Sequence, residues 1–333
     1  MGTLPSQPAQ VLTSASTTVA TDLAAGSDAG AKAPEYIGMP KGQELNEMEA
    51  IDLARSRPVQ WVVLAGPTDA GKTTLLTSLY ELFQWREVQE YAFAGSMTLP
   101  GLEERCYLSR IESGNRLPKT QRTPYVRPDP LYLHLRIRST KGLRPFRDIL
   151  CTDVSGEMFE HARDSTDECK KMTFLKRAHH FLLFLDSAKA VQPDKRWAMI
   201  EEGRALLRSC VDSEMIGASC VVNFVWSRFD YFAAAEAETG HRVFRTEAEK
   251  QLRKSFHGAL PTLMFSEVAA RPLKFPQLQM GHGVPALFQQ WAETPLKMQA
   301  LGLFPRSFSG ARESELFAAR HFASTTANED SNG

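Results

Sequence analysis

Eight consecutive residues carry the side-chain types and the spacing that phosphate binding requires. The stretch Gly66-Pro-Thr-Asp-Ala-Gly-Lys-Thr73 matches the phosphate-loop pattern G-x-x-x-x-G-K-[ST] at every fixed position. Gly66 and Gly71 let the backbone curl so that successive N–H groups point at a phosphate chain. Lys72 supplies a positive charge for the outer phosphates, and the Thr73 hydroxyl is placed to bind magnesium. We therefore expect a nucleotide to contact Gly66, Asp69, Ala70, Gly71, Lys72, Thr73 and Thr74.

The residues on either side of this loop have the patterns that the motif needs. The apolar run Val59–Ala65 predicts a strand before it, and residues 74–83 predict a helix after it. The start of that helix adds the positive end of its dipole to the phosphate site. Strand, loop and helix together favour phosphate binding over a chance match of eight residues.

A second candidate site lies at the end of the apolar run Arg147–Asp153. It has the sequence Asp153-Val-Ser-Gly156, and an Asp at the end of a strand can hold magnesium through water. Gly156 can turn its N–H toward a terminal phosphate and move when that phosphate leaves. The alternative is an ordinary strand-ending Asp and a turn Gly. Because a phosphate loop precedes it in the chain, we favour the functional interpretation.

The overall composition excludes some partners and suggests a compartment. Lys plus Arg and Asp plus Glu number 39 each in 333 residues, so no net charge indicates nucleic acid or an anionic membrane as a partner. The five cysteines include no CxxC pair, which favours unbridged thiols in a reducing cytoplasm. No apolar run approaches the length of a membrane span.

Composition also divides the chain into three parts. Residues 1–42 are rich in Ala, Ser, Thr, Pro and Gly and predict a disordered leader. Residues 43–305 predict one domain with an insertion at about 84–130, and residues 306–333 predict a flexible tail. The insertion occupies the position at which nucleotide switches place a loop that closes over the terminal phosphate.

The order of the expected elements predicts an α/β fold of the P-loop NTPase type. Residues 131–138 alternate apolar and polar side chains, which predicts an edge or half-exposed strand in a hairpin with Arg147–Asp153. Helices and strands then alternate to the end of the domain. This order predicts a doubly wound, mostly parallel sheet with one antiparallel strand and helices on both faces.

A third motif carries a resemblance to a known class. The stretch Ser227-Arg-Phe-Asp230 directly follows the apolar run 221–226, and here the sequence resembles the Ras-like, translation-factor-type (TRAFAC-class) GTPases with their N/T-K-x-D motif. The resemblance implies that Asp230 accepts two hydrogen bonds from guanine and that the Arg228 stem lies along the base. Ser227 and Arg228 depart from the usual residues. The resemblance also assigns Ser266 to the last base-contacting loop.

The middle of the chain resembles the bacterial double-GTPase type more specifically. The resemblance covers about residues 57–300 and depends on the segment Phe-x-Gly-Ser-x-Thr-Leu-x-Gly-Leu-Glu-x-Arg at 93–105, in addition to the phosphate loop and Asp153-Val-Ser-Gly-Glu157. It implies a GTP- and GDP-binding, magnesium-dependent molecular switch in a bacterial conflict or stress system. The implied partner is a second GTPase or a second copy of the chain.

The broader resemblance to Ras-like GTPases suggests roles in hydrolysis for two residues. Glu157 occupies the position of a water-orienting Gln, and its carboxylate would repel the phosphate, so we expect slow unassisted hydrolysis. Asp69 occupies a position at which some GTPases bind a potassium or sodium ion between the phosphates. A loop Asp that points to solvent is the alternative for Asp69.

The insertion supplies the remaining candidates. Thr123 is the expected switch threonine that completes the magnesium shell, and Thr120 is the alternative. Arg122 or Arg105 could neutralise charge on the phosphates, although surface arginines in a polar loop are the simpler interpretation. Two other functions stay open at this point, a pseudo-GTPase scaffold and a P-loop ATPase or kinase.

Overall fold

Seven strands form a single sheet in the order β2-β3-β4-β1-β5-β6-β7 in this computed structural model. The structure describes residues 42–107, 130–141, 146–235, 239–274 and 277–294, so most of the predicted leader and the whole predicted tail lie outside the described residues. The strands are β1 (Val59–Ala65), β2 (Tyr91–Gly95), β3 (Leu131–Ser139), β4 (Arg147–Asp153), β5 (His180–Asp186), β6 (Val221–Ser227) and β7 (Leu263–Val268).

The direction of the strands confirms the predicted fold class. β4, β1, β5, β6 and β7 pair in parallel, whereas β3 runs antiparallel to both of its neighbours, β2 and β4. The hairpin of β3 and β4 and the one antiparallel strand were both expected from the sequence. Because β1, β4, β5 and β6 are parallel, their carboxyl ends meet at one edge of the sheet, which we call the carboxyl edge.

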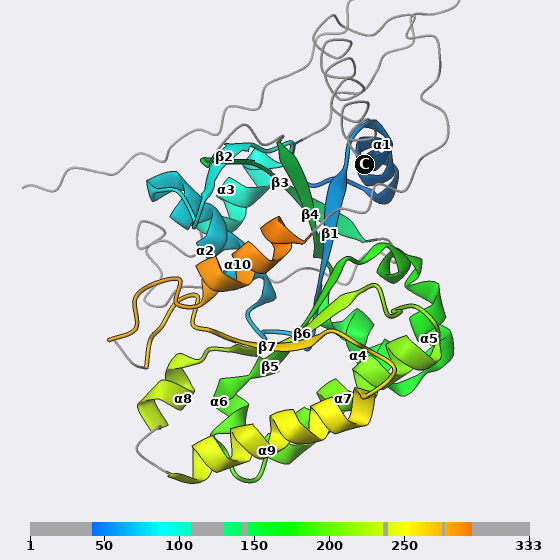
Figure 1. Cartoon of the computed structure of the whole chain (residues 1–333), viewed down its shortest axis with the longest axis vertical. Helices are drawn as coiled ribbons and strands as arrows, with labels where there is room; N and C mark the ends of the chain where they lie inside the picture. The colour runs from blue at the N-terminus through cyan, green and yellow to red at the C-terminus, as the bar shows by residue number, and fades with distance from the viewer. Residues whose placement is uncertain (1–41, 108–129, 142–145, 236–238, 275–276, 295–333) are drawn as a thin grey trace, which may run out of the picture. The chain divides into compact units, whose positions relative to one another are not determined.

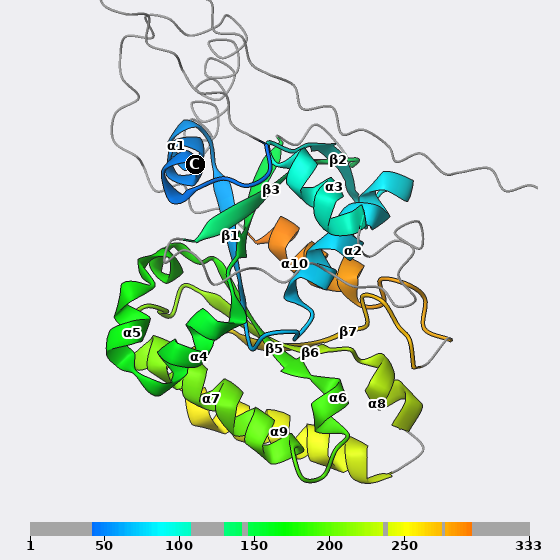
Figure 2. The ribbon, with the colours of Figure 1, turned by 180° about the vertical axis from the view of Figure 1, so that it is seen from behind.

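Helices cover both faces of the sheet (Figure 1). On one face lie α2 (Lys72–Trp85), α3 (Leu99–Tyr107) and α10 (Val284–Glu293). On the other lie α4 (Gly156–Asp164), α5 (Thr166–Lys171), the 3-10 helix η2 (Thr173–Arg177), α7 (Arg196–Asp212) and α9 (Thr239–Phe256). The view from behind shows the same two layers (Figure 2). The short helices α6 (Ser187–Ala190) and α8 (Asp230–Ala235) follow β5 and β6, and α1 (Glu47–Ser56) packs beside β1 and β3.

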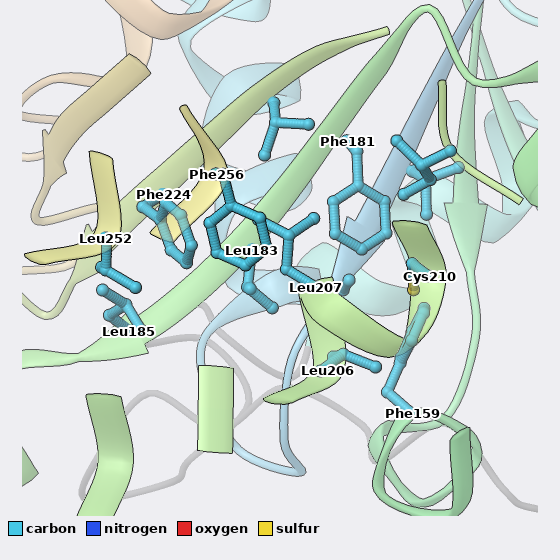
Figure 3. Packing of buried hydrophobic residues seen from close by; sticks show 14 of the residues in the cluster. Phe159, Phe181, Leu183, Leu185, Leu206, Leu207, Cys210, Phe224, Leu252 and Phe256 are labelled. Carbon is cyan, nitrogen blue, oxygen red and sulfur yellow. The ribbon is translucent and has the colours of Figure 1, made fainter. Parts of the chain in front are cut away.

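The larger apolar core joins β5 and β6 to the helices α7 and α9 (Figure 3). Every residue of β5 is buried, which is the pattern of a central strand covered on both faces. Each large apolar side chain buried here contributes about 1.5–3 kcal/mol. The side chains labelled in Figure 3 are Phe159, Phe181, Leu183, Leu185, Leu206, Leu207, Cys210, Phe224, Leu252 and Phe256.

The cysteines and the helices bear on two expectations from composition. All five cysteines lie in the described ranges, are buried, and form no disulfide there. Among the described residues, no helix is both long and apolar enough to span a membrane.

One prediction about the sheet was wrong. The sequence suggested that residues 131–138 form an edge or half-exposed strand, but β2 pairs with the outer side of β3, which is therefore interior and mostly buried. β2 has only five residues, three of them Ala or Gly, and a register shift lies between Phe93 and Gly95. A strand so short and irregular gives little periodic signal, and only its pairing partner reveals it.

The segment after β2 is fastened to β3 by a set of polar contacts. The Ser96 hydroxyl donates to the His134 carbonyl at 2.6 Å, and the His134 N–H donates to Thr98 Oγ1 at 2.9 Å. The Met97 N–H donates to His134 Nδ1 at 2.9 Å, so the ring proton lies on Nε2, which donates to Asp148 Oδ1 at 2.8 Å. Residues of the segment 93–105, which carries the double-GTPase resemblance, therefore attach the chain to the edge of the sheet, in addition to any part in switching.

Helix α3 approaches the chain before α1 without room for a side chain. A Cβ on Gly101 would lie 1.7 Å from the Gln43 carbonyl oxygen. Glu103, on the same helix, accepts hydrogen bonds from Tyr80 at 2.6 Å and Gln84 at 2.7 Å, both of which belong to α2. The helix is thus held on two sides, by residue 43 and by α2.

We predict that Gly101→Ala destabilises the fold although Ala favours helices. The added methyl group must push backbone apart, which costs about 1–3 kcal/mol in a packed site. Urea unfolding measures the change. The control is Gly217→Ala, because a Cβ there meets nothing within 4 Å. Equal stability of the two variants would contradict the close approach.

Candidate functional site

The loop 66–73 joins β1 to α2 at the carboxyl edge. Gly66 has φ 138 and Gly71 has φ 91, conformations that favour glycine. Gly71 is also the N-cap of α2, and no side chain within the described residues caps it. The first backbone N–H groups of α2 are therefore left for an anion.

Two other residues of the loop, Asp69 and Ala70, differ in their exposure. Asp69 is exposed and has φ 62, a left-handed conformation that Asp tolerates better than most residues. This geometry favours the interpretation of Asp69 as a loop residue that points to solvent. Ala70 is buried, and its N–H donates to the Pro67 carbonyl at 3.4 Å. Thr73 and Thr74 lie in the first turn of α2, as a phosphate loop requires.

Lys72 lies folded back on the loop that it follows. Its Nζ donates to the Gly66 carbonyl at 2.9 Å and to the Pro67 carbonyl at 2.8 Å. Burial lowers the pKa of Lys72 from its ordinary value of 10.5 to about 8, although the charges of Asp153, Glu160 and Asp69 oppose the shift. A phosphate chain at this position would add negative charge beside the buried ammonium group.

The second motif closes against the same loop. Asp153 ends β4 and is 7 % exposed, and Gly156 begins α4. A Cβ on Gly156 would lie 2.2 Å from the Thr68 nitrogen, so the start of α4 touches the phosphate loop through backbone. Glu157 follows in the first turn of α4, where its N–H donates to Ser155 Oγ at 3.4 Å.

Arg105 is not the surface arginine that the simpler interpretation of the sequence suggested, because its side chain is only 11 % exposed. In the structure its guanidinium donates to Asp153, the predicted magnesium ligand, and to Glu44. Spacing along the chain could not reveal this contact, because residues 105 and 153 meet only through tertiary packing.

The third motif lies next to the loop at the end of β6. A Cβ on Gly71 would lie 3.8 Å from the Ser227 Cβ. Asp230 is 2 % exposed, and its Oδ2 accepts hydrogen bonds from the N–H groups of Leu273 and Lys274, both at 2.9 Å. The predicted base-reading carboxylate therefore also orders the chain after β7.

Arg228 makes a contact that the sequence did not reveal. It has φ 50 and its guanidinium pairs with Asp186, which ends β5 and caps α6. The sequence did offer one signal that Asp186 belongs to the site: like Asp153, it lies at the end of an apolar strand.

The structure places Ser266 inside β7, two residues before the strand ends. Its Oγ accepts a hydrogen bond from Asn223 Nδ2 at 2.9 Å. The loop that follows β7 begins at Ala269, and the Ala270 carbonyl accepts from Ser78 of α2 at 3.2 Å. A base-contacting loop in this position would include Ala269 and Ala270, which the sequence analysis did not select.

The predicted switch residues cannot be placed with the others. Thr123, its alternative Thr120, and Arg122 lie outside the described residues. Within the described ranges, no three His, Cys, Asp or Glu side chains gather into a metal-binding group.

The residues that are present fit a phosphate group. The hydroxyl of Thr68 is buried and has no hydrogen-bond partner among the described residues, which costs about 1–3 kcal/mol. The uncapped start of α2 and the ammonium group of Lys72 lie on the same loop. A bound phosphate would satisfy donors of all three kinds.

The family profile of Double-GTPase 2 matches residues 60–292. This range includes the phosphate loop, the carboxylates of Asp153 and Asp230, and Arg105. The chain belongs to the Double-GTPase 2 family. This membership confirms the P-loop GTPase type that the motifs predicted. No curated protein matches the sequence.

Solved structures with a similar arrangement include three GTPase-related proteins. The signal recognition particle receptor SRb-GTP/SRX complex from Chaetomium thermophilum has 16 % identity and a TM-score of 0.37, over 71 % of this chain and 96 % of that chain. The S. cerevisiae Ski7 GTPase-like domain bound to GTP has 12 % identity and a TM-score of 0.38, over 74 % of this chain and 53 % of that chain. A bacterial selenocysteine-specific elongation factor, EF-Sec, has 14 % identity and a TM-score of 0.34, over 72 % of this chain and 29 % of that chain.

The lowered pKa of Lys72 predicts a rise of stability with pH. Between pH 8 and 10.5 the unfolded chain still binds the proton that folded Lys72 has released. The free energy of unfolding of the nucleotide-free protein should therefore increase across that range, and Lys72→Met should lack this part of the increase. Urea unfolding of both proteins at several pH values gives the difference. Curves that stay parallel would contradict the shift.

Proposed function

We propose that this double-GTPase binds GTP and GDP with magnesium, hydrolyses GTP slowly, and acts as a nucleotide-dependent switch. The observation that carries the proposal is the meeting of three motifs at the carboxyl edge. The phosphate loop touches Gly156 on one side and lies beside Ser227 on the other. Ligands of open α/β sheets bind at this edge.

The phosphate end of the site provides positive charge and backbone donors. Lys72 would leave the carbonyls of Gly66 and Pro67 and pair with the outer phosphates. The N–H groups at the start of α2 would surround the phosphate chain. Thr73 and Asp153 would hold the magnesium ion, which neutralises charge that develops on the phosphates.

The base end favours guanine through Asp230. A buried carboxylate that accepts hydrogen bonds from the guanine edge discriminates strongly against adenine, which offers a different pattern of donors. Leu273 and Lys274 already donate to its Oδ2, and these bonds hold the carboxylate in a defined orientation. The ion pair with Asp186 holds the Arg228 side chain, which the resemblance places along the base.

Switching would act through the backbone contact between α4 and the loop. The nitrogen of Thr68 leaves no room for a Cβ at Gly156, so the start of α4 lies directly against the backbone of the loop. The N–H of Gly156 would sense the terminal phosphate, and α4 would transmit the change. We also propose a cytoplasmic location, because five buried cysteines without a disulfide suit a reducing compartment.

The partner and the biological role follow from the family alone. We propose a second GTPase or a second copy of the chain as the partner, within a bacterial conflict or stress system. The exposed Asp69 and its left-handed backbone give no support to a bound potassium or sodium ion, so we leave monovalent ions out of the proposal.

A nucleotide-binding scaffold without useful catalysis is the second candidate function. Two observations favour it. Glu157 has a carboxylate where a neutral water-orienting group would repel the phosphate less. Arg105 occupies the carboxylate of Asp153, which a catalytic magnesium ion would need.

We predict that the purified full-length protein carries guanine nucleotide and that binding requires magnesium. Lys72→Ala should abolish both binding and phosphate release, because no other ammonium group lies on the loop. Chromatography of the released nucleotide and a phosphate-release assay measure the two properties. The control is Lys141→Ala, whose side chain is 72 % exposed at the far end of β3. Bound adenine nucleotide would favour an ATPase, and binding without phosphate release would favour the scaffold.

We predict that Glu157→Gln hydrolyses GTP several-fold faster than the wild type and that Glu157→Ala is slower. Gln removes the repulsion of the phosphate and retains an oxygen that can orient water, whereas Ala removes both. Single-turnover hydrolysis of pre-bound GTP measures the rate. Glu168→Gln, on α5, is the control for a change of charge on this face. Rates that stay the same in all four proteins would exclude Glu157 from the chemistry.

A further inference from the structure

Arg105 bridges two carboxylates that come from distant parts of the chain. Its Nε donates to Asp153 Oδ2 at 3.0 Å, and a terminal nitrogen donates both to Asp153 and to Glu44 Oε1. The other terminal nitrogen donates to the Gly101 carbonyl at 3.0 Å. The side chains are 11 % exposed for Arg105, 5 % for Asp153 and 25 % for Glu44.

The bridge places a positive charge beside the buried carboxylate of Asp153. A carboxylate that is almost fully buried is unstable without a positive partner, and the Arg105 guanidinium is such a partner. Burial by itself would lower the pKa of Arg105, but the charges of Asp153 and Glu44 outweigh it and raise the pKa above its ordinary value. Arg105 therefore stays charged under all ordinary conditions.

A magnesium ion at Asp153 would compete with this guanidinium. Both cations neutralise the same carboxylate, and Lys72 already lies close enough for Asp153 to raise its pKa. Two or three positive groups around one carboxylate repel one another in a poorly solvated site. Glu44 already binds Arg105 and is the more exposed of the two carboxylates, so it can accept the guanidinium that the ion displaces.

We propose that Arg105 is a positioning residue that takes the place of magnesium on Asp153 and shifts to Glu44 when magnesium binds. The proposal depends on magnesium-dependent nucleotide binding, the function proposed above. It makes the segment before α1 part of the metal-sensing machinery. Only the side chain needs to move, because Gly101 and Glu103 hold α3 in place.

The two substitutions that test this have opposite expected signs. Arg105→Gln removes the competitor, so half-maximal nucleotide binding should need less magnesium. Glu44→Gln removes the alternative acceptor and leaves Arg105 on Asp153, so more magnesium should be needed. We expect a shift of about three- to tenfold in each direction, the scale of one partly buried ion pair. General damage to the fold would raise the magnesium requirement in both variants.

The experiment is a magnesium titration of fluorescent GDP binding to the full-length protein at fixed ionic strength. The matched control is Glu47→Gln, because Glu47 lies in the same part of the chain and pairs at 2.7 Å with Arg177, which does not contact Asp153. Glu47→Gln should leave the magnesium requirement unchanged. Arg105→Lys retains the charge and should stay closer to the wild type than Arg105→Gln.

Each outcome decides between the hypotheses. Opposite shifts for Arg105→Gln and Glu44→Gln support the proposal, and shifts in the same direction, or none, overturn it. If Arg105→Gln does not fold, Glu44→Gln compared with Glu47→Gln still decides, because an unchanged requirement in Glu44→Gln overturns the proposal. Nucleotide binding by the wild type that does not depend on magnesium would instead remove the proposed function on which the inference rests.

Discussion

The buried charge of Asp153 is the constraint on which the rest of the site depends. The Asp153 side chain at the end of β4 is 5 % exposed and needs positive partners, and the described residues provide Lys72 and Arg105 from different elements. Lys72 approaches from the start of α2, and Arg105 approaches from α3. The loop before α2 depends on the positive φ angles of Gly66 and Gly71, and α3 depends on Gly101, where backbone leaves no room for a side chain. Packing and electrostatics thus specify the same arrangement.

The segment 93–105 shows how one stretch of sequence serves both structure and function. Ser96 and Thr98 hydrogen-bond the backbone of His134, and Glu103 holds α2, so most of its polar residues are structural. Arg105, the last of them, reaches the site itself. Most of the polar residues in this segment therefore attach it to β3 and α2, and Arg105 connects it to the predicted metal ligand Asp153.

At the base end of the site, Asp230 also serves both structure and the proposed function. Asp230 holds the chain after β7 with Oδ2, and that chain is also tied to α2 through Ser78. The two ends of the site therefore share a support, since α2 begins at the phosphate loop and contacts the loop after β7 through Ser78. A change at either end would be felt at the other through one helix.

The sequence by itself determined the elements whose signals are local. The strand, loop and helix around 66–73 followed from residue types and periodicity, and the order of the remaining elements predicted a doubly wound sheet with one antiparallel strand. Tertiary structure alone decided the rest. It added β2 outside β3, because a five-residue strand is recognised by its partner and not by its own pattern. It paired Arg105 with Asp153 and Glu44, and Arg228 with Asp186. An ion pair between residues 42 to 61 positions apart depends on how helices and strands pack, which no spacing in the chain records.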